Sequence, residues 1–190
     1  MTTRFRLLVV AAAVVISALG AVAWSQYAAG GDPEPDVVLD EPGNYVLPGL
    51  VTNPSFANGD LPDIPLLDAE GDEVRLVPDG RPMVVNLWYS TCPPCARELV
   101  DFAAADEALG SRIRFVGVNP VDSPEVMLRF AGDRGVDYEL LRDPGGRFGE
   151  ELDVVAYPAT LFVDVDGTIL ASTGVIDERG LRERIAELWP

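Results

Sequence analysis

The feature that most constrains the fold of this chain is an apolar run that leads directly into a pair of cysteines. Residues 83–88 (MVVNLW) are almost continuously apolar, as expected of a strand that is buried on both faces. The motif Cys92-Pro93-Pro94-Cys95 follows, and residues 93–109 carry helix-forming residues up to Gly110. Pro93 suits the first turn of a helix, because the N–H that proline lacks has no partner there. The sequence therefore predicts a buried strand, a short turn, and a helix that begins at the cysteines.

The rest of the chain alternates strand and helix patterns around this unit. Turn formers at residues 69–72 separate two short strand patterns and predict a hairpin ahead of the buried strand. The further elements that we expect are strands at 64–67, 73–77, 113–118, 139–141, 160–165 and 168–172, and helices at 123–135, at 147–152 and after a cap at Asp177. This order predicts an α/β fold, with a mixed central sheet flanked by helices and an N-terminal β-hairpin extension.

The N-terminal segment predicts export. Arg4 and Arg6 precede an apolar segment at residues 7–24, which is barely long enough to span a bilayer and predicts a signal anchor with the domain on the extracytoplasmic side of the cell membrane. A cleaved signal peptide and a secreted domain are the alternative, because residues 21–23 have the small-x-small form of a cleavage site. We therefore divide the chain into a signal segment (1–29), an acidic spacer rich in proline and glycine (30–42) and one domain (43–190).

Composition excludes several classes of function. The formal net charge is −17, so the chain repels phosphate backbones and we expect no nucleic-acid partner. Histidine is absent, which removes catalytic triads and metal sites that depend on it. We expect no metal and no cofactor, since two cysteines cannot complete a tetrahedral site unless carboxylates or a second chain contribute. Cysteine and carboxylate chemistry remain.

The two cysteines predict a redox couple rather than a structural crosslink. A disulfide across two intervening residues closes a very small loop, so it stabilises the fold weakly but opens and closes with little backbone movement. At a helix N-terminus, Cys92 faces unpaired N–H groups and the positive end of the helix dipole, which favour the thiolate. We expect Cys92 to be the attacking nucleophile and Cys95, one turn into the helix, to be the resolving thiol.

A third candidate, Glu98, lies one turn further along the predicted helix. The spacing of Cys95, Glu98 and Phe102 puts this carboxylate on the apolar stripe beneath the cysteines. A partly buried acid in that position can have a raised pKa and exchange protons with Cys95 while the disulfide opens. The alternative interpretation is a solvated glutamate on the outer face of the helix, paired with Arg97.

These residues carry a resemblance to a known family. The run VVNLWYSTCPPC, the downstream Tyr157-Pro158-Ala159-Thr160 and the order of elements resemble the thioredoxin fold, in particular its exported TlpA/ResA-like thiol-disulfide oxidoreductases, over about residues 61–188. One departure is Thr91, where most of these relatives carry tryptophan. The resemblance implies that Pro158 is a cis-proline facing the disulfide. It also implies that a bound partner contacts Trp88, Pro93, Pro94, Tyr157 and Pro158.

The resemblance bears on proton transfer as well. In ResA-like proteins, the glutamate at the motif position of Glu98 is the residue that exchanges protons. Asn86 stands where thioredoxin carries a buried aspartate, so a carboxylate proton acceptor is missing at that point and Glu98 becomes the better candidate. The alternative for Asn86 is a simple hydrogen bond within the strand layer.

The function that the resemblance implies is disulfide exchange between the Cys92–Cys95 couple and exported proteins. TlpA/ResA-like relatives commonly keep the haem-attachment cysteines of apocytochromes c reduced, with electrons from a CcdA-like membrane protein, and we expect a reductase of this kind. An oxidase that forms disulfides in exported proteins shares every motif and is the first alternative. A peroxiredoxin-type peroxidase is disfavoured because Tyr89 stands where that branch carries threonine. A copper chaperone of the same fold is disfavoured because its metal site resembles two cysteines plus a histidine, and this chain has no histidine.

Overall fold

The computed structural model describes Ser17, Gly20, Trp24 and residues 52–190. The predicted signal segment and the acidic spacer lie outside the described residues, apart from those three positions, which are helical. In the described part of the chain, no helix combines the length and the apolar character needed to cross a bilayer. The folded domain lies within one compact unit, Pro48–Pro190.

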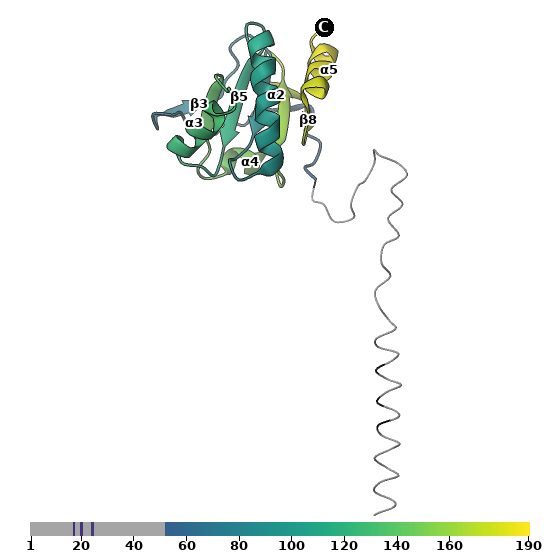
Figure 1. Ribbon diagram of the computed structural model, residues 1–190. Coiled ribbons are helices and arrows are strands. Elements are labelled where there is room, and N and C mark those ends of the chain that lie inside the picture. Colours follow the sequence, from purple (N-terminus) through teal and green to yellow (C-terminus); the bar gives the residue numbers. More distant parts are fainter. Residues whose placement is uncertain (1–16, 18–19, 21–23, 25–51) are drawn as a thin grey trace, which may run out of the picture. The chain divides into compact units, whose positions relative to one another are not determined.

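The domain is built on one mixed sheet of eight strands, in the order β1-β8-β7-β4-β5-β6-β2-β3 (Figure 1). The strands are β1 (Gly59–Asp60), β2 (Pro65–Leu67), β3 (Glu73–Arg75), β4 (Met83–Leu87), β5 (Arg114–Asn119), β6 (Glu139–Arg142), β7 (Ala159–Val163) and β8 (Thr168–Thr173). Strand β4 is parallel to β5 and antiparallel to β7, and each of its residues pairs on both sides. The cysteine motif therefore begins just beyond the C-terminal end of a central strand.

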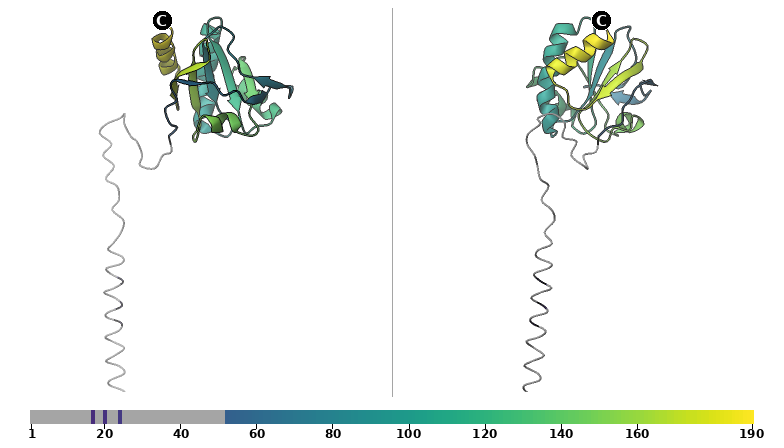
Figure 2. Two further views of the ribbon diagram at one scale, coloured as in Figure 1. Left: turned by 180° about the vertical axis from the view of Figure 1, so that it is seen from behind. Right: turned by 90° about the vertical axis from the view of Figure 1, so that its right-hand side faces the viewer.

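Helices cover both faces of this sheet. They are α2 (Pro93–Leu109), α3 (Pro124–Gly132), α4 (Arg147–Glu151) and α5 (Glu178–Leu188). Helices α2 and α5 lie side by side on one face (Figures 1 and 2). Helix α2 begins where the sequence predicts it, because Cys92 is its N-cap and Pro93 occupies its first turn.

The residues of β4 alternate between two hydrophobic cores, as the period of a strand requires. Val84 and, just after the strand, Trp88 belong to the core that contains buried residues of α2, α3 and α5. Met83, Val85 and Leu87 belong to the opposite core, which includes Phe148 of α4. All residues of β4 are buried, as the continuous apolar run predicts.

The predicted N-terminal hairpin is confirmed as β2 and β3. A carboxylate oxygen of Asp68 accepts hydrogen bonds from the N–H groups of Glu70, Gly71 and Asp72, at 3.1, 2.9 and 2.8 Å, and closes the turn. Gly71 has a φ of 93°, which favours glycine. The hairpin extends the sheet beyond β6, where Leu67 lies opposite Arg142.

The expected α/β architecture is confirmed, and one strand adds to it. Strand β1 pairs with β8, with Gly59 opposite Ile169 and Asp60 opposite Thr168. The sequence pattern does not predict β1, because two exposed residues show no alternation of apolar and polar side chains.

Candidate functional site

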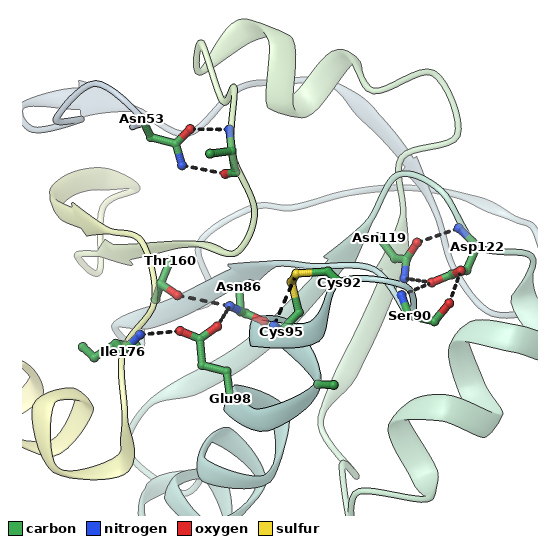
Figure 3. The surroundings of a disulfide bond; sticks show 12 residues. Asn53, Asn86, Ser90, Cys92, Cys95, Glu98, Asn119, Asp122, Thr160 and Ile176 are labelled. Atoms are coloured by element: carbon green, nitrogen blue, oxygen red, sulfur yellow. Dashed lines mark hydrogen bonds between the residues drawn. A yellow bond between two sulfur atoms is a disulfide. The ribbon is translucent and has the colours of Figure 1, made fainter. Parts of the chain in front are cut away.

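The predicted redox couple is a disulfide in the structure. Cys92 and Cys95 are bonded, and their Cα atoms lie 5.3 Å apart (Figure 3). The Cys92 Sγ also accepts a hydrogen bond from the backbone N–H of Cys95, at 3.3 Å. Cys92 is 3% exposed and Cys95 is fully buried, so a partner approaching the motif meets Cys92 first. A sulfur at a helix N-terminus that accepts a backbone N–H is in an environment that stabilises a thiolate.

Glu98 lies one turn below the disulfide, where the sequence predicts it, and its residue is 2% exposed. Its Oε1 accepts the backbone N–H of Ile176 at 2.6 Å, and its Oε2 accepts the side-chain amide of Asn86 at 3.5 Å (Figure 3). Burial raises the pKa of Glu98 to about 7, although these two hydrogen bonds act to lower it. The carboxyl group therefore changes its charge close to neutral pH, as a group that exchanges protons with a thiol must do.

Asn86 connects Glu98 to the neighbouring strand. Its Nδ2 also donates to the Thr160 Oγ1 at 3.1 Å, across β4 and β7. The Asn86 Oδ1 is buried and has no hydrogen-bond partner among the described residues. Asn86 thus supplies a neutral donor to Glu98 from within the strand layer, which leaves the carboxyl of Glu98 as the titrating group of this network.

The Tyr157–Pro158 peptide bond is cis, as the resemblance implies. Pro158 is buried and Tyr157 is half-buried, with its ring edge-on to the ring of Tyr89 at a centroid distance of 5.4 Å. Because Tyr89 belongs to the loop that leads to Cys92, this contact joins the cis-proline loop to the cysteine motif. A hollow of about 450 Å³ borders the cis bond, and Phe56 and Val175 are among the other residues that line it.

A residue that the sequence analysis did not single out holds the cis-proline loop. Asn53 accepts the backbone N–H groups of Val155 and Ala156 with its Oδ1, both at 2.8 Å (Figure 3). Its Nδ2 donates to the carbonyl of Ala156 at 2.7 Å. This side chain therefore fixes the backbone of the two residues just before Tyr157, Val155 and Ala156. No local pattern in the sequence predicts this contact, because Asn53 and Ala156 are about a hundred positions apart in the chain.

The structure does not bring all the predicted partner contacts to one surface. Pro93 is exposed and Pro94 is half-buried, next to the disulfide. Trp88, in contrast, is fully buried and stacks on Phe130 at a centroid distance of 5.9 Å. The prediction that Trp88 contacts a partner is therefore wrong for this conformation, because Trp88 ends the apolar run and is part of the core.

The fold and this site together define a class. A C-x-x-C disulfide after a central strand, on a thioredoxin-like fold, belongs to the thiol-disulfide oxidoreductases. The chain is a member of the AhpC/TSA family, whose sequence model matches residues 57–172.

Named relatives agree with this class. The chain is 28% identical over 144 residues to the thiol:disulfide interchange protein DsbE of Pseudomonas fluorescens biotype C, covering 74% of this chain and 76% of the relative. It is 32% identical over 112 residues to the thiol:disulfide interchange protein HelX of Rhodobacter capsulatus, covering 58% of this chain and 62% of that relative. Among solved structures, it resembles dsbF of MTB in its mixed oxidised and reduced forms, with 25% identity, a TM-score of 0.59, and coverage of 66% of this chain and 95% of that one. The chain is thus a thiol-disulfide oxidoreductase, and it is similar to the proteins named DsbE and HelX.

Proposed function

We propose that this protein is an extracytoplasmic reductase that exchanges the Cys92–Cys95 couple with disulfides of exported proteins. The observation that carries the proposal is the position of Cys92, whose sulfur caps α2 and is the more exposed of the pair. The resemblance to TlpA/ResA-like proteins supports the direction, with apocytochrome c as the partner and a CcdA-like membrane protein as the electron donor. The apolar segment at residues 7–24 supports a membrane anchor.

The exchange begins from the reduced couple. The Cys92 thiolate attacks one sulfur of the partner's disulfide, so a Cys92–partner bond forms, the partner's S–S bond breaks, and the first partner thiolate leaves and takes up a proton. Cys95 then loses its proton and attacks the Cys92 sulfur. The Cys92–Cys95 bond forms, the mixed disulfide breaks, and the second partner thiolate leaves. Two electrons pass from the couple to the partner. The donor later returns two electrons, and Cys95 regains its one proton while Cys92 is again a thiolate.

Glu98 accepts the proton of Cys95 in the second step. The carboxylate is one helical turn from Cys95, and its pKa of about 7 makes it a base that is partly ionised at neutral pH. When the donor reduces the disulfide, the same group returns the proton. Its burial keeps bulk water from replacing it in this role.

The loop that ends in the cis peptide holds the partner's chain in this proposal. The backbone of Tyr157 pairs with the segment that flanks the partner's cysteine, and exposed Pro93 contacts it beside the disulfide. The net charge of −17 favours a partner with a basic surface. Trp88 has no part in this contact, since it is buried.

The reduction potential of the couple tests the direction. We expect a value near or below about −270 mV, as for thioredoxin, when the purified domain is equilibrated with glutathione and dithiothreitol buffers. A value near about −120 mV, as for a dedicated oxidant, would make disulfide formation in exported proteins the function.

Variants of the two cysteines test the order of the steps. We expect C95S to accumulate a mixed disulfide with partner proteins and C92S to accumulate none, because only Cys92 attacks the partner. Trapping by C92S alone would reverse the two roles. Rapid consumption of hydrogen peroxide by the reduced wild type would favour the peroxidase alternative.

A further inference from the structure

The short loop between β4 and Cys92 is tied to another part of the molecule. Ser90 lies two residues before Cys92 and is half-buried. Its backbone N–H donates to the Asp122 Oδ2 at 2.7 Å, and its Oγ donates to the Asp122 Oδ1 at 2.6 Å (Figure 3). One carboxylate therefore holds both the peptide and the side chain of the residue that leads into the cysteine motif.

Asp122 is itself held in place from two neighbouring strands. The Nδ2 of Asn119, at the end of β5, donates to the Asp122 Oδ2 at 2.7 Å, and Asn119 is fully buried. The Oδ1 of Asn119 accepts the backbone N–H of Asp122 at 2.8 Å. Arg142, at the end of β6, donates through Nε to the Asp122 carbonyl at 3.2 Å. Asp122, Asn119 and Arg142 thus form a hydrogen-bonded frame, and the buried Asn119 anchors this frame in the core.

This frame explains how a loop residue can have a fixed place next to a reacting atom. Hydrogen bonds to a carboxylate are short and stronger than those between neutral groups. A nucleophile that is misplaced by about 1 Å can lose about a hundredfold in rate. The Cys92 sulfur needs its place over the N–H groups at the start of α2, and the position of the Ser90 peptide determines the path of the chain into that turn.

We infer that Asp122 is a positioning residue for Cys92: its carboxylate anchors Ser90 to the ends of β5 and β6 and so holds the sulfur at the N-terminus of α2. The inference rests on the proposed function in one respect, that Cys92 is the nucleophile. The inference adds Asp122, a residue of the β5–α3 loop, to the residues that support the reaction. Asp122 touches neither the partner nor the sulfur in the proposed mechanism.

Two substitutions of Asp122 separate its hydrogen bonds from its charge. In D122N, the amide oxygen in the place of Oδ2 still accepts from Ser90 and Asn119, and the amide NH₂ reaches the Ser90 hydroxyl oxygen. In D122A, all three bonds are lost. Both variants remove one negative charge, so an effect of charge alone has the same sign in both. D133A, at an exposed aspartate just after α3, is the matched control for the loss of one carboxylate.

The readout is the rate at which iodoacetamide alkylates Cys92 in the reduced chain at pH 7, which needs no partner protein. We expect D122A to slow alkylation about tenfold, and D122N and D133A to stay within about twofold of the wild type. The midpoint of the pH profile of alkylation moves upward in D122A only. An unchanged or faster rate in D122A overturns the inference, as does a loss in D122N equal to that in D122A.

A second variant keeps the inference testable if D122A folds poorly. S90A removes only the bond from the Ser90 hydroxyl and leaves the bond from its N–H, so we expect a two- to threefold slower alkylation, with thermal unfolding of the oxidised chain close to that of the wild type. If D122A does not fold, a wild-type rate of alkylation in S90A contradicts the positioning role. Failure of the proposed reductase function alone leaves these alkylation rates unchanged.

Discussion

Two carboxylates border the cysteine motif, and the structure holds them in different ways. Glu98 lies under the disulfide, 2% exposed, with one strong hydrogen bond from Ile176 and one long one from Asn86. Asp122 lies beside the loop into the motif, half-buried, and accepts three hydrogen bonds of 2.6 to 2.7 Å. Burial with few hydrogen-bond donors raises the pKa of Glu98, whereas three short hydrogen bonds hold the carboxylate of Asp122 in a fixed position. In the proposed mechanism the same chemical group therefore carries a proton in one place and anchors a loop in the other.

The largest expected consequence of this difference is in the pH dependence of stability. The pKa of Glu98 is about 7 in the folded chain against a usual value of 4.5, so the folded chain binds more protons than the unfolded one between these values. The stabilising effect of the neutral form is fully present below about pH 4.5 and is lost as the pH rises through 7. Between pH 5 and pH 8 we expect the wild type to lose up to about 3 kcal/mol of unfolding free energy relative to E98Q.

Urea denaturation of the oxidised chains at both pH values measures this difference. E107Q, at an exposed glutamate on the same helix, is the control and follows the wild type. If the free energies of E98Q and the wild type change in parallel between the two pH values, Glu98 does not titrate as described.

The next effect concerns the rate of exchange. We expect E98Q to slow reduction of a partner disulfide about 10- to 100-fold at pH 7 and to remove an inflection near pH 7 from its pH–rate profile, because general acid–base catalysis is lost. D122N keeps that inflection, since Asp122 holds the loop and carries no proton in the reaction. Stopped-flow measurement of the exchange from pH 5 to pH 9 gives both profiles. An inflection that persists in E98Q, or one that disappears in D122N, removes the distinction between the two carboxylates.

A smaller effect is expected from the neutral anchor on the other loop. N53A removes three hydrogen bonds from the backbone before the cis peptide, so we expect KM for a protein partner to rise about fivefold, or about 1 kcal/mol, with kcat little changed. Alkylation of Cys92 stays at the wild-type rate, because this loop does not carry the sulfur. S55A, at an exposed residue of the same segment, is the control. A fall in kcat with an unchanged KM would show that Asn53 acts on the cysteine motif instead.

Much of the fold can be read from the sequence, because its elements have strong local signals. The continuous apolar run predicts a central strand, and β4 is buried throughout and paired on both sides. Pro93 and Gly110 bracket the long helix, and α2 spans Pro93–Leu109. The two-residue β1 carries no such signal, since it depends on pairing with β8, more than a hundred residues away.

Residues of the site can be predicted from the sequence where their spacing along a helix places them on one face. Residues of the site that lie singly in loops cannot be predicted in this way. The burial of Glu98 follows from its place on the apolar stripe of α2, and the structure confirms this burial. Asn53 and Asp122 are ordinary polar residues in loops, and their contacts with Ala156 and Ser90 depend on the assembled fold. The error at Trp88 has the opposite cause: its place in the motif suggested a contact surface, but the adjoining strand carries it into the core.

The pairing of β4 along its whole length limits how much the oxidised and reduced forms of the protein can differ in structure. A strand that is paired with both β5 and β7 along its whole length is held in register when the disulfide opens. The oxidised and reduced forms are therefore expected to share one scaffold and to differ only around Cys92 and Cys95. In the proposed function, an electron donor and an electron acceptor are therefore expected to recognise the same few residues around Cys92 and to exclude each other from that surface.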